Sequence, residues 1–273
     1  DGILQPEAEQ CDDGAANGAN GSCSANCFVQ VGAGCALPTL IVTQGASLVE
    51  KYNWGGTIAP TTNPAHNAVV TTPMIANVDA DIQPEIIFNS VDPTRPFQEG
   101  YLRILDGSSG VEQITIGPVK GSTGVAIGDL TNNGTIDIVT LTNSLDDYSL
   151  PSGPTDEIRS FSPNGVEQFR TSSVSGMVSP NGYPAIADLD QDGNAEIILA
   201  GRVFNGENGS LDPIQNQSPF FQGALNTSVA ADVDSNGILD IITILDIWFD
   251  DGTTCDFGGA TGRIGVADFI PSD

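Results

Sequence analysis

The chain repeats one short pattern four times between residues 75 and 242, and this repeat limits what it can fold into. Each copy is an apolar stretch, an acidic loop, and then Asp or Glu followed by Ile and further apolar residues. Oxygen-bearing side chains recur at loop positions one, three, five and nine. Hard cations such as Ca²⁺ prefer about six to eight oxygen ligands, and alternate residues of a tight loop can point at one centre. The repeat therefore predicts calcium binding at up to four sites.

The candidate ligands are loop positions one, three, five, seven and nine, with position seven acting through its backbone carbonyl. Position six is Gly in three loops, which permits the turn, whereas Ile82 in the first loop argues against the same geometry there. In chain order the candidates are Asn77, Asp79, Asp81, Gln83 and Glu85; Asp129, Thr131, Asn133, Thr135 and Asp137; Asp188, Asp190, Asp192, Asn194 and Glu196; and Asp232, Asp234, Asn236, Ile238 and Asp240.

The four loops differ in charge. The third loop carries four carboxylates and the second only two, so ligand charge predicts the tightest binding at the third loop and the weakest at the second. EF-hand loops open in the same way, but they close with an acid at position twelve and are flanked by helices. The simpler alternative is that Asp, Asn and Gly only favour β-turns. Four copies in register, each followed by a strand pattern, favour metal binding.

The composition is strongly acidic. The chain has 35 acidic and 8 basic residues, which gives a formal net charge of −27. Bound divalent cations would reduce the resulting repulsion and would couple metal binding to folding. Nucleic acids and anionic membranes need a basic surface, so we expect neither as a partner. No apolar run is long enough for a membrane span, and we expect no membrane insertion.

The first 36 residues contain four of the five cysteines and few apolar residues. So small a segment needs covalent links, and disulfides indicate an oxidising, extracellular compartment. The segment resembles the myxococcal-type cysteine-rich disulfide repeat of secreted bacterial proteins. Three pairings stay open, and Cys255 is either a partner for an unpaired cysteine or a free thiol. The predicted disulfide cysteines are Cys11, Cys23, Cys27 and Cys35.

The spacing of the loops predicts the architecture of the rest. The loops begin at residues 77, 129, 188 and 232, a spacing that suits four-stranded blades of a β-propeller. Asp106-Gly, Asn164-Gly and Asn205-Gly lie between apolar stretches and predict hairpins. Helical periodicity is absent. We therefore expect an all-β fold with residues 1–36 as a disulfide module, 37–49 as a linker or first strand, and 50–273 as antiparallel blades.

The segments that lead into the loops carry a more specific resemblance. Four such segments, each with its loop, are similar to FG-GAP/VCBS repeats of integrin α-like propellers, namely Pro73-Met-Ile-Ala-Asn77, Val125-Ala-Ile-Gly-Asp129, Pro184-Ala-Ile-Ala-Asp188 and Val229-Ala-Ala-Asp232. The resemblance implies about four blades, calcium in their loops, and a role in adhesion, carbohydrate or protein contact, or as an accessory domain of a secreted enzyme. Residues 264–268 repeat the approach to a fifth loop, so we expect the propeller to be incomplete in this chain.

Catalysis has little support in the sequence, and we expect no enzyme activity. His66 lies in a Pro- and Asn-rich stretch that predicts an exposed side chain. Tyr52 and Trp54 either stack on a sugar or pack against the first blade. The acidic stretch from Trp248 to Cys255 reads as a long, irregular loop. Glycoside hydrolysis by acids outside the loops stays open, for which the candidates are Asp146, Asp147 and Asp156.

These features together predict a secreted, calcium-stabilised structural or adhesive surface protein. Its partners would be neighbouring copies or missing parts of the same protein in an extracellular assembly, with glycans or surface proteins as further ligands. The alternative is a calcium-dependent, lectin-like carbohydrate-binding domain, or an accessory domain of a secreted polysaccharide-degrading enzyme.

Overall fold

The computed structural model describes residues 50–79, 81–143, 155–171, 174–175, 182–199, 201–212, 227–244 and 246–256. The described residues from Lys51 onwards belong to one compact unit. The predicted disulfide module at 1–36, the segment 37–49 and the start of a fifth unit at 264–268 lie outside the described residues. So do the predicted disulfide cysteines and two of the acids considered for hydrolysis, namely Cys11, Cys23, Cys27, Cys35, Asp146 and Asp147.

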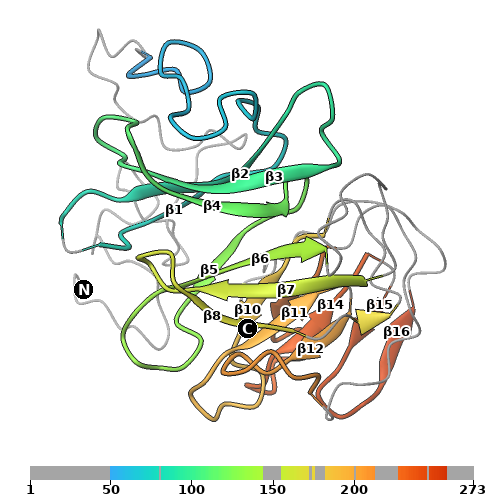
Figure 1. Ribbon diagram of the computed structural model, residues 1–273. Coiled ribbons are helices and arrows are strands. Elements are labelled where there is room, and N and C mark those ends of the chain that lie inside the picture. Colours follow the sequence, from blue (N-terminus) through green and yellow to red (C-terminus); the bar gives the residue numbers. More distant parts are fainter. Residues whose placement is uncertain are drawn as a thin grey trace, which may run out of the picture. The chain divides into compact units, whose positions relative to one another are not determined.

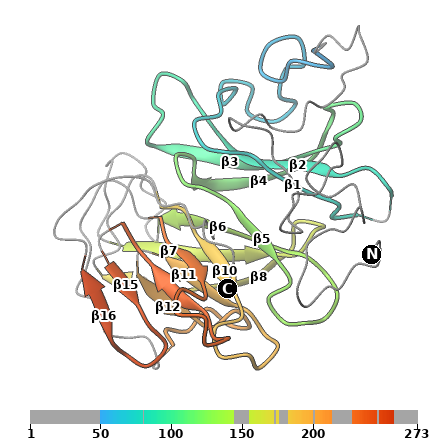
Figure 2. The same ribbon diagram turned by 180° about the vertical axis from the view of Figure 1, so that it is seen from behind.

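All regular elements in the described residues are β-strands, which confirms the all-β prediction, and they form four antiparallel sheets (Figures 1 and 2). In chain order the sheets are β1 (Met74–Ala76), β2 (Glu85–Val91), β3 (Glu99–Leu105) and β4 (Glu112–Lys120); β5 (Ala126–Gly128), β6 (Asp137–Asn143), β7 (Thr155–Phe161) and β8 (Glu167–Arg170), with β9 (Val174–Ser175) on β7; β10 (Ala185–Ala187), β11 (Glu196–Leu199) and β12 (Arg202–Phe204); and β13 (Val229–Ala231), β14 (Asp240–Ile242), β15 (Asp246–Trp248) and β16 (Thr254–Asp256).

The first two strands of every sheet form a hairpin around an acidic loop, in one common register. The residue before loop position one always pairs with position nine. The four pairs are Ala76 with Glu85, Gly128 with Asp137, Ala187 with Glu196, and Ala231 with Asp240. The repeat seen in the sequence is therefore a repeat in the backbone, and it places the acidic loops at equivalent points of the four sheets.

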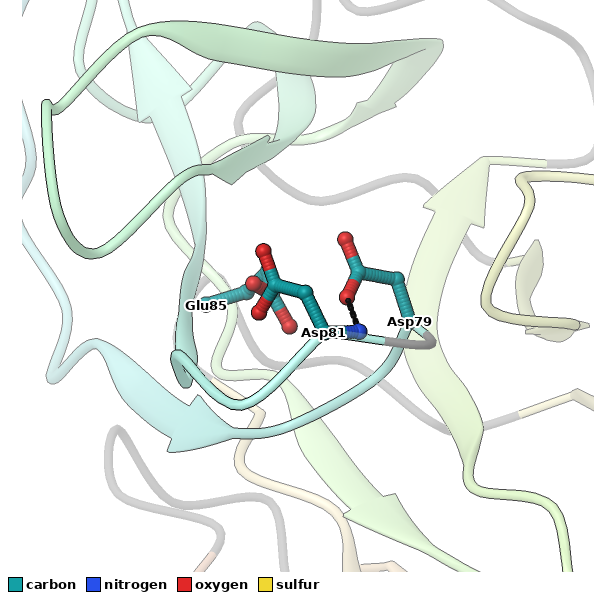
Figure 3. Close-up of side chains that lie close together, drawn as sticks. All are labelled: Asp79, Asp81 and Glu85. Carbon is teal, nitrogen blue, oxygen red and sulfur yellow. Dashed lines mark hydrogen bonds between the residues drawn. The ribbon is translucent and has the colours of Figure 1, made fainter.

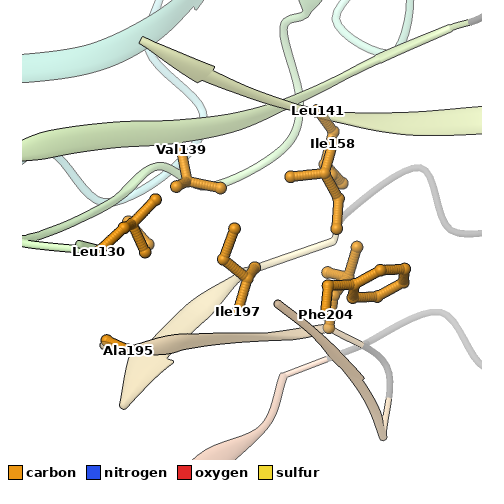
Figure 4. Packing of buried hydrophobic residues seen from close by; sticks show 9 residues of the cluster. Leu130, Val139, Leu141, Ile158, Ala195, Ile197 and Phe204 are labelled. Atoms are coloured by element: carbon orange, nitrogen blue, oxygen red, sulfur yellow. The ribbon is translucent and has the colours of Figure 1, made fainter. Parts of the chain in front are cut away.

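Neighbouring sheets pack through three apolar clusters. Successive residues of a strand face opposite sides, so Ile138 on β6 packs towards the first sheet and Val139 packs towards the third. On β11, Ile197 and Ile198 divide in the same way between the second and fourth sheets. Figure 4 shows the cluster between the second and third sheets. This double burial explains why β6 and β11 each begin, after the position-nine acid, with two adjacent apolar residues.

The predicted hairpin turns are present. Those after Asp106 and Ser162 join β3 to β4 and β7 to β8, and the turn at Asn205 follows β12. Gly209 in the last of these has a φ of +71°, and a Cβ there would lie 2.6 Å from the Phe169 ring. Glycine at this point lets a turn of the third sheet rest directly on the second.

The prediction of a long, irregular loop from Trp248 to Cys255 is wrong. Trp248 ends β15 and Cys255 lies in β16, which pair as a hairpin of the fourth sheet. The turn is closed by the Phe249 N–H, which donates to the Thr253 carbonyl at 3.0 Å, and Gly252 adopts a φ of +82°. The two strands are short, and the acidic Asp-Gly turn between them made the whole stretch resemble a loop in the sequence. Cys255 is a free, exposed thiol.

The segment before β1 packs on the first sheet. The Trp54 ring meets Phe88 edge-on at 4.9 Å, and Tyr52 lies against Gly110. Both aromatic residues thus pack on the first sheet, which is one of the two alternatives that the sequence left open. His66 is half-buried rather than exposed, because its ring contacts Tyr101 at 4.8 Å.

Two further points concern the membrane and the propeller. The described part of the chain contains no helix that could cross a membrane. Sequential antiparallel sheets, stacked face to face, are the arrangement that blades adopt locally. Closure into a propeller stays a prediction.

Candidate metal centres

Three of the four acidic loops bring carboxylates together. In each group one oxygen per residue lies within 4.8 Å of the others. Figure 3 shows the first group, in which three side chains of one loop lie close together. The groups are Asp79, Asp81 and Glu85; Asp188, Asp190 and Glu196; and Asp232, Asp234 and Asp240. Like charges at this separation repel one another, so a bound cation or protons would stabilise such a group.

The carboxylate at position nine is anchored in the same way in all four loops. One of its oxygens accepts a hydrogen bond from the backbone N–H of position two, at 2.8 or 2.9 Å. These acids begin the second strand of each hairpin and are almost fully buried, with exposures of 0% for Glu85, Asp137 and Asp240 and 4% for Glu196. Burying an ionised carboxylate is costly unless charge or hydrogen bonds compensate it.

Position one repeats a second contact in three loops. The carboxylates of Asp129, Asp188 and Asp232 each accept a hydrogen bond from the N–H of the Gly at position six. The first loop differs, because Asn77 donates its side-chain amide to the Asp81 carbonyl at 2.6 Å. Ile82 does not have a positive φ, whereas the Gly at position six of each other loop does. The first loop therefore turns differently, as Ile82 led us to expect, yet it still gathers three carboxylates.

Positions five and seven are linked in every loop. The N–H of position seven donates to a side-chain oxygen of position five, at distances from 2.6 to 2.8 Å. The residues at position seven are Gln83, Thr135, Asn194 and Ile238. In the third loop this contact uses Asp192, which is not a member of the gathered group. Three of the four carboxylates of that loop thus converge, and the fourth shapes the turn.

Two loops contain a buried carboxylate oxygen without any hydrogen-bond donor. These atoms are Oε1 of Glu85 in the first loop and Oδ1 of Asp188 in the third. An unsatisfied buried oxygen costs about 1–3 kcal/mol, and more when it is charged. Both residues belong to the gathered groups, so a cation held by these groups would satisfy the two oxygens. The oxygen-only donor set also matches a hard cation.

The electrostatics of the third loop reflect the same crowding. Burial raises the pKa of the Glu196 carboxyl, and the nearby Asp190, Asp188 and Asp192 raise it further, against the hydrogen bond from the Leu189 N–H. In the second loop the balance is reversed. Partial removal from water acts to raise the pKa of Asp129, but backbone N–H donors, led by Gly134, outweigh it and lower this pKa.

The second loop forms no group of three acids within the described residues. It has only two carboxylates, and they are held by protein donors instead. Asp137 accepts a hydrogen bond from Leu130 at 2.9 Å through Oδ2 and one from the Gln168 side chain at 2.8 Å through Oδ1. The expected order, in which the second loop binds least tightly, stays a prediction.

Sequence reasoning missed the residues that reach the loops from later strands. Gln113 donates to Asp79 at 3.3 Å from β4, and Gln168 donates to Asp137 from β8. Both follow a Val-Glu pair after a hairpin turn, so a comparison of the hairpins could have found them. In the fourth sheet, the Asp250 carboxylate accepts a hydrogen bond from the Asn236 amide at 2.8 Å.

Fold and loops define an all-β protein of stacked antiparallel sheets with acidic hairpin loops suited to hard cations. Neither a known protein family nor a curated protein sequence matches this chain. Among solved structures, the Vibrio cholerae biofilm matrix protein Bap1 is similar with a TM-score of 0.54 and 22% identity, over 72% of this chain and 32% of that one. A rhamnogalacturonan lyase of Bacillus licheniformis is similar with a TM-score of 0.52 and 14% identity, over 75% and 46%. The chain thus spans less than half of either protein, and the likeness concerns the fold.

Proposed function

We propose that this protein is a secreted structural or adhesive surface protein whose sheets are stabilised by calcium. The observation that carries the proposal is the convergence of three carboxylates at the same point of the first, third and fourth sheets. In a chain with a net charge of −27, cations bound where carboxylates converge would reduce the charge repulsion most. The similar fold of a biofilm matrix protein supports an extracellular setting.

Calcium fits these loops better than other common cations. Every candidate donor is an oxygen, which disfavours zinc and other metals that prefer nitrogen or sulfur. The loops offer up to five protein oxygens on a flexible hairpin, whereas Mg²⁺ demands stricter geometry and retains several waters. When bound, the ion would supply positive charge to buried carboxylates. Glu85 and Asp188 would each give it an oxygen that no protein donor satisfies.

We also propose that the sheets are FG-GAP/VCBS-type blades. Four sequential antiparallel sheets, each with its loop after the first strand, are what FG-GAP/VCBS-type blades would form. In this account, neighbouring copies or further parts of the same protein complete the array of sheets, and the loops keep each sheet in register with the next. The loop acids serve the cation and not catalysis, so we propose no enzyme activity.

A second function is calcium-dependent carbohydrate binding. It is favoured by the fold that the chain shares with a rhamnogalacturonan lyase, a protein that acts on a polysaccharide. The two functions make different demands. A structural subunit needs calcium for its own stability and assembly, whereas a lectin-like domain must also present a sugar to the ion or to aromatic side chains.

Sedimentation of the purified protein in calcium and after removal of cations, together with a glycan array in calcium, tests the proposal. The structural function predicts larger species only in calcium and no bound glycan. Binding of a glycan that disappears without calcium would select the carbohydrate-binding function instead. The variant Asp188→Asn is a matched probe, since it removes one charge from the third loop without changing its shape. Sedimentation that is independent of calcium in both proteins would contradict the structural function.

A further inference from the structure

The four loops differ in what satisfies the buried acid at position nine. In the first loop, Glu85 accepts one hydrogen bond from Val78 at 2.8 Å through Oε2, and its Oε1 has no donor. In the second loop, Asp137 is equally buried, but both of its oxygens have donors. The second donor is the side chain of Gln168. The oxygen that has no donor in the first loop thus accepts an amide N–H in the second. In the fourth loop both oxygens of Asp240 also have donors, the N–H groups of Val233 and Asp250, but Asp240 lies in a group of three carboxylates, which the second loop lacks.

The Gln168 amide comes from β8, the outer strand of the same sheet. Its counterpart in the first sheet, Gln113, follows the same Val-Glu pair but donates to Asp79 at position three, at the longer distance of 3.3 Å. Asp137 is one methylene shorter than Glu85 and keeps its carboxylate near the strands. This recessed position is within reach of β8, so the two glutamines contact different positions of their loops.

The other acid of the second loop is also saturated. Asp129 accepts hydrogen bonds from Gly134 at 2.7 Å through Oδ2 and from Asn133 at 3.1 Å through Oδ1. The side chains at positions three and five bond to each other, since the Asn133 amide donates to the Thr131 hydroxyl at 2.7 Å. A cation entering this loop would meet two negative charges instead of three or four and would have to displace existing donors.

We infer that Gln168 closes the second loop in place of a cation, so that this loop holds its shape without calcium while the other three depend on it. At Asp137, the positive end of the amide dipole takes the role that a cation would have at Glu85 in the first loop. The inference rests on the proposed function, because it divides the calcium loops into two kinds. It implies that the second sheet keeps its first hairpin when cations are removed.

Counting bound calcium ions by native mass spectrometry tests the inference. Asp129→Asn should leave the number of bound ions unchanged, whereas Asp188→Asn should lower it by one. Gln168→Glu removes the amide and adds a third carboxylate, so this variant should bind one ion more than the natural chain. Gln113→Glu is the matched control, and it should leave the count unchanged because the first loop already holds an ion.

A loss of one ion in Asp129→Asn would overturn the inference and leave the proposed function standing. A natural chain that binds no calcium would instead overturn the proposed function.

Hydrogen exchange of backbone amides in the unmodified chain is a second test, and it does not depend on any variant folding correctly. After cations are removed, the amides of Leu130 and Gly134 should remain protected, while those of Val78 and Gly193 should exchange at least tenfold faster. Equal loss of protection in both pairs would contradict closure by Gln168.

Discussion

At the scale of single residues, the acids at positions one and nine are central to the proposed cation dependence of the loops. Asp188 accepts a hydrogen bond from Gly193 at 3.1 Å through Oδ2, and its Oδ1 is buried without a donor. Glu196 lies beside it with an exposure of 4%. Both carboxylates accept a hydrogen bond from a backbone N–H of the loop and both lie in the crowded acidic group. A substitution at either residue should therefore change the stability that a bound ion contributes.

Asp188→Asn should lower the thermal midpoint in calcium by on the order of 5 °C or more, because it removes the stabilisation that one tightly bound ion contributes. In cation-free protein the same change should be neutral or stabilising, since it relieves repulsion with Asp190 and Glu196. Asp251→Asn removes the same charge from an exposed turn and should do neither. Thermal unfolding by circular dichroism measures all three, and an unchanged midpoint for Asp188→Asn in calcium would show that this loop holds no ion.

Glu196 predicts a dependence on pH in cation-free protein. Its pKa is raised by burial above the ordinary value of 4.5, so the folded chain keeps this proton to higher pH than the unfolded chain. Stability from this group should therefore fall as pH rises above 4.5 through the raised pKa. Calcium, which binds the ionised form, should remove the fall. Unfolding by urea across this range, for the natural chain and Glu196→Gln, isolates the effect. Parallel curves for both proteins without calcium would contradict it.

Much of the geometry of the acidic loops could be predicted from sequence, because each loop is local. Nine consecutive residues supply the candidate ligands, the turn and the buried acid, and their alternation is visible in the sequence. The contacts of Gln113, Gln168 and Asp250 were missed because these residues approach from strands or turns 14 to 34 residues away, without a metal-ligand spacing to mark them. Ligand charge placed the second loop last in predicted binding strength, but the hydrogen bond from Gln168 to its buried acid could be found only in the structure.

At the scale of elements, buried arginine joins the segment before β1 to the first sheet. Arg103 on β3 is fully buried and pairs with Glu112 at 2.8 Å. It also donates to Ser90 at 2.7 Å and to the backbone carbonyl of Thr62 at 2.9 Å. The Trp54 ring lies 5.2 Å from its guanidinium. One side chain thus fastens residues between 54 and 66 onto the outer face of the sheet.

Arg103→Met should cost about 3–5 kcal/mol of unfolding free energy, because it leaves the buried Glu112 without its partner. Arg170→Met is the control. Arg170 is 35% exposed and its ion pairs span 3.4 and 3.6 Å, so its loss should cost less than about 1 kcal/mol. Urea unfolding measures both, and equal costs would refute a special role for the buried pair.

The element scale also shows where sequence patterns misled. The hairpin of β15 and β16 was read as an irregular loop because Asp250, Asp251 and Gly252 dominate its centre. Three-residue strands are too short to display alternation, and only pairing with β14 reveals them. The role of Arg103 was equally hidden, since an arginine within an apolar strand gives no sign of which segment will cover it.

At the scale of the whole molecule, the acidic loops of neighbouring sheets touch one another. The Ala195 N–H donates to the Leu130 carbonyl at 3.1 Å, which joins the third loop to the second. The Gln191 side chain donates to the Gly237 carbonyl at 2.6 Å, which joins the third loop to the fourth. Through the second contact, the loss of an ion from the third or fourth loop would loosen the other, whereas the second loop keeps the hydrogen bond from Gln168.

Thermal unfolding of the chain in calcium and after complete removal of cations tests this account most directly. The account predicts that removal lowers the midpoint by on the order of 10 °C or more, that added calcium restores it, and that the carboxylate groups of three loops act together. A midpoint that stays the same with and without calcium would mean that the acidic loops are turns alone and that calcium does not stabilise this fold.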